Sequence, residues 1–306
     1  MIESDVPLPE LAPSGRRRAP DVVVSRAPAC RRKTVRTRCH EWRLPDGTRW
    51  ASVAKGDGDH VMRFRRFAEF VVANHGRSIG WRAPATTRPE TIRHLLLDQV
   101  LPAVAFEHSL IGLHASAVVV NGEGIAFAGP ASRGKSTLAA SFALDGYPVV
   151  TDDCLMLQWR QREPRAVPSY PSLRLWKDTA DRLLGPIPGL TEVAEYTSKL
   201  RVGARVSAIG FRRRPVTVRR IYVLDRRRGA ARIEPLSCRQ AYIELLKVTF
   251  RLDPLDRVTA HREVAALAKL AQSVSVARLR LPSRLDSLGD VRRAVLADLG
   301  RVWKRP

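Results

Sequence analysis

The segment with the clearest chemistry runs from Gly129 to Ser136 and reads Gly-Pro-Ala-Ser-Arg-Gly-Lys-Ser. It matches G-x-x-x-x-G-K-[ST], the phosphate-binding (Walker A) loop, whose glycines allow the backbone to wrap an anion. The backbone N–H groups from Ser132 to Thr137 are expected to face a β-phosphate, while Lys135 brings positive charge to the β- and γ-phosphates. The Ser136 hydroxyl is the Mg²⁺ ligand of this pattern. The chain is therefore expected to bind a nucleoside triphosphate with Mg²⁺.

The nucleotide contacts that this loop predicts come from the loop itself and from the first residues of the helix that follows it. They are Gly129, Ser132, Arg133, Gly134, Lys135, Ser136 and Thr137. Arg133 is expected to face solvent or the edge of the nucleotide. No base-reading motif accompanies the loop, so ATP and GTP are not distinguished by sequence.

Two carboxylates, Asp152 and Asp153, follow a short apolar run that ends at Thr151. Ligands of an open α/β sheet lie where parallel strands end, so both side chains are expected to face the phosphates. One carboxylate could hold Mg²⁺, and the other could accept the proton of an attacking hydroxyl. The alternative is a pair that only caps a turn.

A histidine, His114, stands just before the apolar run Ala115–Val120. A histidine in this place can orient a catalytic carboxylate. The alternative is a structural role, which is the more common one for a histidine beside an apolar strand.

The spacing of apolar residues predicts the strands and helices that position these residues. Ala115–Val120 and Gly124–Ala128 are separated by Asn121-Gly122-Glu123 and predict a hairpin that leads into the loop. Apolar residues at helical spacing predict a helix over Lys135–Leu144. Further expected elements are strands at Pro148–Thr151, Cys154–Gln158, Arg219–Leu224, Ala231–Pro235 and Val274–Leu279, and helices at Lys177–Leu184, Cys238–Lys247, Arg257–Ala271 and Leu288–Leu299. The alternation predicts an α/β fold.

The residues before this region differ in character. Residues 1–35 are rich in Pro and Arg and predict an irregular start with one strand at Asp21–Ser25. Residues 36–88 predict a small antiparallel β region, and residues 89–306 the catalytic domain, beginning with a helix over Pro89–Glu107 that Pro102 kinks or ends. The β strands expected in the small region are Trp50–Lys55, His60–Arg66, Ala68–Asn74 and Ser78–Arg82.

Bulk composition narrows the classes of partner. Lys and Arg number 53 against 30 Asp and Glu, a formal net charge of +23. The arginines are scattered over the whole chain, which favours a GC-rich coding bias over a nucleic-acid surface, because the motifs of nucleic-acid-binding modules are absent. The four cysteines have no metal-site spacing and are typical of reduced thiols. With no signal peptide and no apolar run long enough for a bilayer, the chain is expected to be cytoplasmic, with no membrane partner.

The loop, His114 and the Asp pair together resemble the catalytic domain of HPr kinase/phosphorylase, a bacterial serine kinase with a phosphate loop. The specific part of the resemblance is Leu113–Leu157. It implies a P-loop kinase domain of the HPr kinase type that binds ATP and Mg²⁺, with Lys135 on the phosphates. It further implies that Asp152 is the catalytic base, that His114 supports it, and that Asp153 lies near the metal.

The chain also departs from this family. The family's Arg-Gly-Leu-Gly signature is absent, and the run Tyr170–Trp176 stands after the Asp pair instead; Ser132 stands where the family usually has Gly. The chain looks more like divergent relatives, some of which resemble tailoring kinases that phosphorylate a serine of a lasso peptide precursor. The expected function is transfer of the γ-phosphoryl group of ATP to a serine hydroxyl of a peptide or small protein.

Two other functions stay open on the sequence, namely a small-molecule kinase and a nucleotide-switched ATPase that binds nucleic acid. A homo-oligomer is also open, because relatives of this fold are commonly oligomeric. Arg174 and Lys199 are candidate contacts to phosphate or substrate, since phosphoryl transfer requires positive charge on the transferred group. Both stand in segments that read as polar breaks, where a solvated surface position is the alternative.

Overall fold

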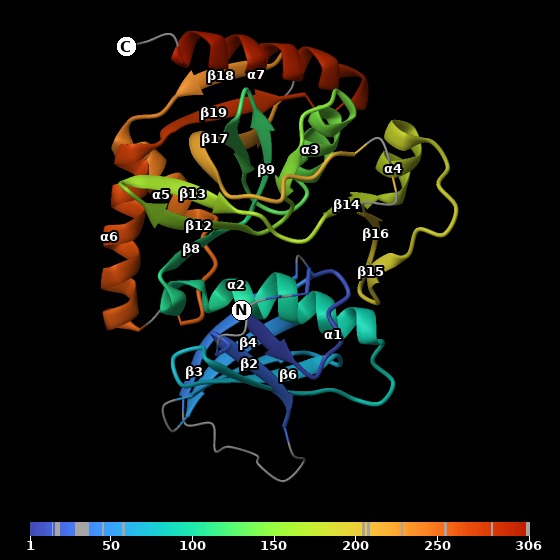
Figure 1. Cartoon of the computed structure of the whole chain (residues 1–306), viewed down its shortest axis with the longest axis vertical. Coiled ribbons are helices and arrows are strands. Elements are labelled where there is room, and N and C mark those ends of the chain that lie inside the picture. Colours follow the sequence, from blue (N-terminus) through green and yellow to red (C-terminus); the bar gives the residue numbers. More distant parts are fainter. Residues whose placement is uncertain are drawn as a thin grey trace. The chain divides into compact units, whose positions relative to one another are not determined.

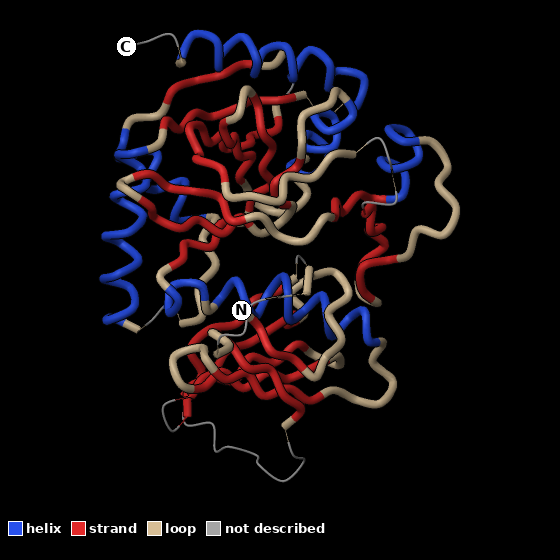
Figure 2. The backbone as a smooth tube through the Cα atoms, viewed as in Figure 1, coloured by secondary structure: helices blue, strands red, loops and turns tan. Residues whose placement is uncertain are grey.

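The structure is a computed structural model of the chain. It describes all residues except 14, 16–18, 28–36, 45, 57–58, 204–205, 207–208, 228, 254–255, 283 and 304–306. The fold is mixed α/β with several sheets (Figures 1 and 2). It divides into two compact units. The first unit comprises Met1–Ser109, Ala194–Tyr196 and Phe250–Glu263, and the second comprises Leu110–Val193, Thr197–Thr249 and Val264–Pro306.

A seven-stranded sheet forms the first unit, in the order β1-β2-β7-β6-β5-β4-β3. The four strands predicted between residues 50 and 82 are confirmed, and each pairs antiparallel with its sequence neighbour. The strands are β1 (Ile2–Ser4), β2 (Val22–Arg26), β3 (Thr37–Arg43), β4 (Arg49–Gly56), β5 (Asp59–Phe64), β6 (Ala68–Ala73) and β7 (Ser78–Arg82).

One face of this sheet is covered by a continuous helical segment (Figure 1). It consists of α1 (Pro89–Leu95), the π-helical turn η1 (Leu96–Val100), α2 (Leu101–Ala103) and the 3-10 turn η2 (Ala105–His108). The regular α-helix gives way to the π-helical turn just before Pro102, and α2 ends at Ala103, directly after it, so the early end expected at Pro102 is confirmed. Leu95, Leu96 and Val100 reach the core between helix and sheet.

The expected domain boundaries therefore shift. Within residues 1–35, the strand expected at Asp21–Ser25 is confirmed as β2, and a further strand, β1, which was not expected, pairs with it in parallel. The helical segment that starts at Pro89 belongs to the first unit, and the second unit starts at Leu110. The reason is packing: the apolar face of that helix is buried on the seven-stranded sheet.

A nine-stranded sheet organises the second unit, with the order β11-β9-β10-β17-β13-β12-β8, while β19 pairs with β17 and β18. β10, β17 and β19 are parallel neighbours. The strands are β8 (Leu110–Leu113), β9 (Ala115–Val120), β10 (Glu123–Ala128), β11 (Val149–Thr151), β12 (Leu155–Arg160), β13 (Glu163–Val167), β17 (Val216–Arg226), β18 (Arg232–Pro235) and β19 (Ser275–Leu281).

A separate three-stranded sheet has the order β14-β16-β15, with β14 (Ser172–Trp176), β15 (Glu192–Ala194) and β16 (Thr197–Gly203). The helices after residue 110 are α3 (Lys135–Leu144), α4 (Lys177–Leu184), α5 (Cys238–Lys247), α6 (Arg257–Ser273) and α7 (Leu288–Val302). All five were predicted within a few residues of these bounds. No helix of the described residues is long and apolar enough to cross a bilayer.

The helix after the phosphate loop is held firmly by the core of the second unit. α3 packs on β9, β10 and α7. Its residues Leu138 and Phe142 are fully buried, and the Phe142 ring lies 5.4 Å from that of Phe127 on β10. Burial of such side chains contributes about 1.5–3 kcal/mol each, so the start of α3 is a fixed platform for the loop.

Candidate active site

The register of β9 and β10 places His114 beside the phosphate loop. The two strands are antiparallel, and Ala128 at the end of β10 lies opposite Ala115 at the start of β9. The Gly129 N–H donates to the His114 carbonyl oxygen at 3.4 Å. The His114 N–H donates to the Val248 carbonyl oxygen at the end of α5, which fixes the histidine backbone.

β11 brings the Asp pair to the same edge. It also runs antiparallel to β9, so β10 and β11 run in the same direction. β10 ends where the loop begins, and β11 ends at Thr151, directly before Asp152 and Asp153. The sequence expectation that these groups meet at the carboxyl ends of parallel strands agrees with this geometry.

The phosphate loop has the backbone of an anion cradle. Gly129, Ser132 and Gly134 have φ values of +152°, +59° and +94°. Ser132 thus adopts a left-handed conformation despite its Cβ, at the position where Gly was expected from the resemblance. α3 begins directly after Gly134 with no side-chain cap, so its first N–H groups have no intrahelical partner. Such groups, at the positive end of a helix, bind phosphate.

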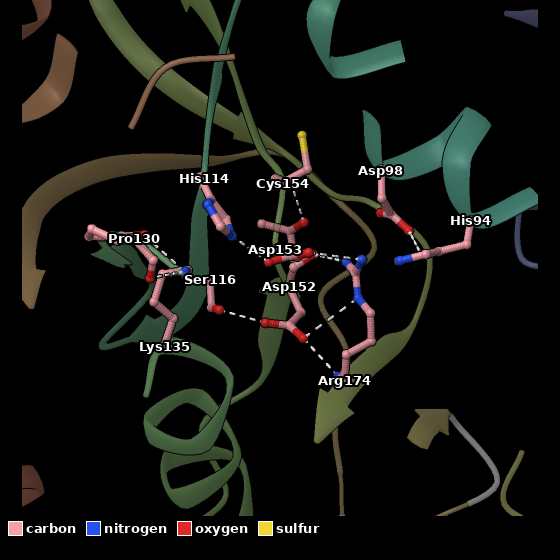
Figure 3. Close-up of polar contacts among 12 residues, drawn as sticks. His94, Asp98, His114, Ser116, Pro130, Lys135, Asp152, Asp153, Cys154 and Arg174 are labelled. Atoms are coloured by element: carbon pink, nitrogen blue, oxygen red, sulfur yellow. Dashed lines mark hydrogen bonds and ion pairs between the residues drawn. The ribbon is translucent and has the colours of Figure 1, made fainter. Parts of the chain in front are cut away.

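Lys135 is the cation of this cradle and is only 4% exposed. Its ammonium donates to the carbonyl oxygens of Gly129 and Pro130, each at 2.9 Å (Figure 3). Burial lowers the pKa of Lys135 to about 8, against the opposing attraction of Asp153 and Asp152. A buried ammonium with a lowered pKa gains from an anion nearby, so the loop favours a phosphate ligand.

The carboxylate of Asp152 points into the interior. Its side chain is 0% exposed. Oδ1 accepts from the Ser116 hydroxyl at 2.5 Å and Oδ2 accepts from the Arg174 backbone N–H at 2.7 Å (Figure 3). A buried carboxylate needs such partners, and here they tie β9, the Asp turn and β14 together. Asp152, the expected catalytic base, is thus enclosed by protein groups and does not line the pocket described below.

The side chain of Asp153 points to the pocket and not into the interior. Its φ of +68° is left-handed and turns its side chain away from that of Asp152. Oδ1 lies 2.7 Å from Nε2 of His114, and Oδ2 lies 3.2 Å from Nη1 of Arg174 (Figure 3). Burial would raise the pKa of the Asp153 carboxyl, but Arg174 and His114 hold it well below its usual range. His114 therefore supports Asp153, whereas the sequence paired it with Asp152.

Arg174 lies on β14 and not in a polar break, and its side chain is 2% exposed. Its guanidinium also donates to the Asp152 carbonyl oxygen at 2.5 Å. The solvated-surface alternative for Arg174 is thus wrong. Lys199, on the neighbouring strand β16, pairs in register with Trp176, and its ammonium lies 5.6 Å from the centre of that ring.

A pocket of about 350 Å³ joins most of these groups. Ser132, Gly134, Lys135, Ser136 and Thr137 line it from the loop and helix, and Asp153, Arg174 and Lys199 line it from the other side. Asp152 and His114 are not among its lining residues. Neither is Arg133, which lines a separate cavity of about 410 Å³ with Pro130 and Arg278.

The pocket also contains residues that the sequence did not single out. They are Trp176, Asp178, Thr179, Arg226 and Leu285. Trp176 is 42% exposed, which is high for so large an apolar side chain, and it stood inside the Tyr170–Trp176 run noted above. Arg226 and Leu285 are distant in sequence and carry no motif, so no sequence signal marks them.

The pocket fits Mg²⁺ in the manner of a nucleotide site. Ser136 and Asp153 both offer oxygen ligands in it. Among the described residues, no group of three or more His, Cys, Asp or Glu side chains could enclose a metal.

Comparisons with known proteins give only distant likenesses, all to solved structures. No family model matches the chain, and no curated protein matches it. Among solved structures, the chain is similar to the Hpr(Ser) kinase/phosphatase from Coxiella burnetii, with 13% identity and a TM-score of 0.33, over 62% of this chain and 97% of that one. A likeness this distant assigns no activity, so the function has to follow from the site.

Proposed function

We propose that the chain is a Mg²⁺-ATP-dependent phosphotransferase whose acceptor is a hydroxyl group. The observation that carries this proposal is the shared pocket, which Asp153 lines together with the loop residues Lys135 and Ser136. A triphosphate bound by the loop would extend its γ-phosphate into a space that also holds an ionised carboxylate and the Arg174 guanidinium. Those are the parts that phosphoryl transfer requires.

We assign to Asp153 the role of orienting the acceptor hydroxyl and accepting its proton. The hydroxyl oxygen attacks the γ-phosphorus, the bond to the β–γ bridging oxygen breaks, ADP leaves, and the hydroxyl proton passes to Asp153. His114 and Arg174 each engage one carboxylate oxygen, so the side chain is held in place and stays ionised. A weakly basic carboxylate suits a loose transition state, in which orientation of the hydroxyl matters more than early deprotonation.

The cations of the pocket have separate tasks in this scheme. Lys135 would bring positive charge to the β- and γ-phosphates, and Arg174 on β14 and Lys199 on β16, which line the same pocket, would stabilise charge on the transferred group. Ser136 would hold Mg²⁺, which supplies neutralisation of charge on the phosphate oxygens when it is bound.

The finer part of the proposal is that the acceptor is a serine of a peptide or small protein, of which a lasso peptide precursor is one example. It is supported by the sequence resemblance alone. The test is to incubate the full chain with ATP, Mg²⁺ and a serine-containing peptide library, beside a library in which alanine replaces serine. We expect a mass increase of one phosphate only in the serine library. ADP formation with no labelled peptide in either library would contradict the peptide acceptor, and no ADP formation at all would contradict the phosphotransferase.

A further inference from the structure

The proposed reaction leaves unused a groove of about 560 Å³ in the first unit. Its lining residues come from β4, β5, β6, the end of β7 and the loops next to them, all within the first unit. Five of the described lining residues are arginines and one is an acid: Arg49, Arg63, Arg65, Arg66, Arg82 and Glu69. We propose that this groove binds an acidic segment of a peptide or protein partner.

Strand register already builds a carboxylate site in this groove. Arg63 on β5 lies directly opposite Glu69 on β6, and Glu69 lies opposite Arg82 on β7. Glu69 accepts from Arg63 Nε at 2.5 Å and pairs with Arg82 Nη2 at 2.5 Å. Arg63 and Arg82 remain 43% and 33% exposed. The two guanidiniums therefore clamp one carboxylate while the clamp itself stays open to solvent, and guanidinium is the cation whose fork matches carboxylate geometry.

The turn between β5 and β6 adds two arginines, for which no ion pair with a described acidic residue is seen. Arg65 and Arg66 are both exposed, and Arg66 has a left-handed φ of +71°. A left-handed arginine in a turn is uncommon, since Gly or Asn adopts this conformation at lower cost. On the β4 side, Arg49 is 43% exposed and pairs with Glu41 at 3.2 Å. The groove is thus rimmed by arginines on both sides.

The aromatic residues of the groove favour a peptide over a nucleic acid. The Trp50 ring lies 4.3 Å from that of Tyr196, 6.0 Å from that of Phe64 and 6.1 Å from that of Phe67. These rings pack on one another within the first unit, whereas single-stranded nucleic acids need open ring faces on which bases stack. A groove of this volume also has room for a few side chains of a peptide, whereas a nucleic-acid strand needs contacts to a longer run of phosphates.

Binding can be measured with the full chain by fluorescence anisotropy and without nucleotide, so failure here would leave the proposed phosphotransferase untouched. The probes are a fluorescein-labelled alternating Glu-Ser peptide, the matched Gln-Ser peptide and a labelled single-stranded DNA of mixed sequence. We expect the Glu-Ser peptide to bind and the Gln-Ser peptide to bind at least about tenfold more weakly. The double variant Arg65→Ser, Arg66→Asn should lower the affinity for the Glu-Ser peptide by roughly tenfold, because two charge-assisted contacts are lost.

The matched control is Arg77→Ser, Arg88→Ser, which removes two exposed arginines of the first unit that do not line the groove. It should bind like the wild type. A third variant, Glu69→Gln, removes the carboxylate that Arg63 and Arg82 bind and should raise the affinity for the Glu-Ser peptide several-fold. Glu3→Gln, at an exposed acid elsewhere in the first unit, should not change this affinity.

Three results would overturn the proposal. The first is equal binding of the Glu-Ser and Gln-Ser peptides. The second is unchanged binding in the Arg65/Arg66 variant, confirmed as folded by circular dichroism, together with no gain in Glu69→Gln. The third is tighter binding of the DNA than of the Glu-Ser peptide with the same sensitivity to Arg65 and Arg66, which would assign the groove to nucleic acid.

Discussion

The turn after β11 carries two neighbouring carboxylates, one directed into the protein interior and one directed to the pocket. On the interior side, Asp152 has no exposed surface and both of its oxygens accept hydrogen bonds that tie β9 to β14. On the pocket side, Asp153 is 17% exposed and keeps its charge between His114 and Arg174. Two identical side chains thus have different surroundings: Asp152 is enclosed and bonded to β9 and β14, whereas Asp153 lines the pocket and is the carboxylate to which we assign the chemistry.

The largest effect is expected on the pocket side at the loop. Lys135→Ala removes the charge on the β- and γ-phosphates, and we expect kcat/KM for phosphoryl transfer to fall by about 10³-fold or more, with weakened ATP binding. Calorimetry with ATP and a coupled ADP assay measure the two effects. Lys177→Ala, at a 70% exposed lysine on α4, is the control and should behave like the wild type. Wild-type ATP affinity and turnover in Lys135→Ala would contradict the assignment of the nucleotide site.

A smaller effect is expected at His114, which acts through Asp153. His114→Ala should lower kcat by roughly 10- to 100-fold, the scale seen when a partner that orients a reacting group is removed. ATP affinity should change little, because His114 does not line the pocket. His114→Gln, whose amide can still donate to Asp153, should recover part of the loss. If both variants only lower the thermal midpoint and leave kcat intact, His114 has a structural role.

The lowered pKa of Lys135 predicts how ATP affinity depends on pH. Bound phosphate favours the charged ammonium, so above the free-state pKa of about 8 each binding event must take up a proton. The affinity should be flat below about pH 8 and should then fall by up to about tenfold per pH unit. Lys135→Arg, which stays charged, should remove this fall. The measurement is ATP affinity by calorimetry across this range, and an equal fall in Lys135→Arg would assign it to another group.

The smallest effect on turnover is expected on the interior side. Asp152→Asn should lower the free energy of unfolding by about 1–3 kcal/mol, because the hydrogen bonds from Ser116 and the Arg174 amide lose their charged acceptor. Turnover per folded molecule should change little. Urea unfolding and an active-site titration measure these quantities, and an undiminished stability would remove the structural role of Asp152.

Much of the second unit could be predicted from its sequence. The hairpin of β9 and β10, the bounds of α3 and the position of the Asp pair follow from apolar period and from the loop motif, which are local signals. The choice between Asp152 and Asp153 could not be predicted, because the left-handed φ of Asp153 reverses the direction of its side chain and no residue type signals it. Arg174 was missed as a buried residue because its partners are the two carboxylates, which lie far away in the sequence.

In the first unit the strands from β4 to β7 and the strand at β2 were predicted, because their apolar residues form a local pattern. The short strand β1 was not predicted, because only its parallel pairing with β2 makes it a strand. Of the groove arginines, Arg63, Arg65 and Arg66 are close in sequence, whereas Arg49 and Arg82 are distant from them. They gather on one face because register places Arg63 and Arg82 on either side of Glu69.

The most direct test compares Asp153→Asn with Asp152→Asn in transfer of labelled γ-phosphate from saturating ATP to the serine peptide library. We predict that Asp153→Asn binds ATP like the wild type but transfers about 10²–10⁴-fold more slowly, because it loses the group that accepts the hydroxyl proton. The folded fraction of Asp152→Asn should transfer at close to the wild-type rate. The reverse result, with Asp153→Asn active and folded Asp152→Asn inactive, would contradict the assignment of Asp153 as the reacting carboxylate.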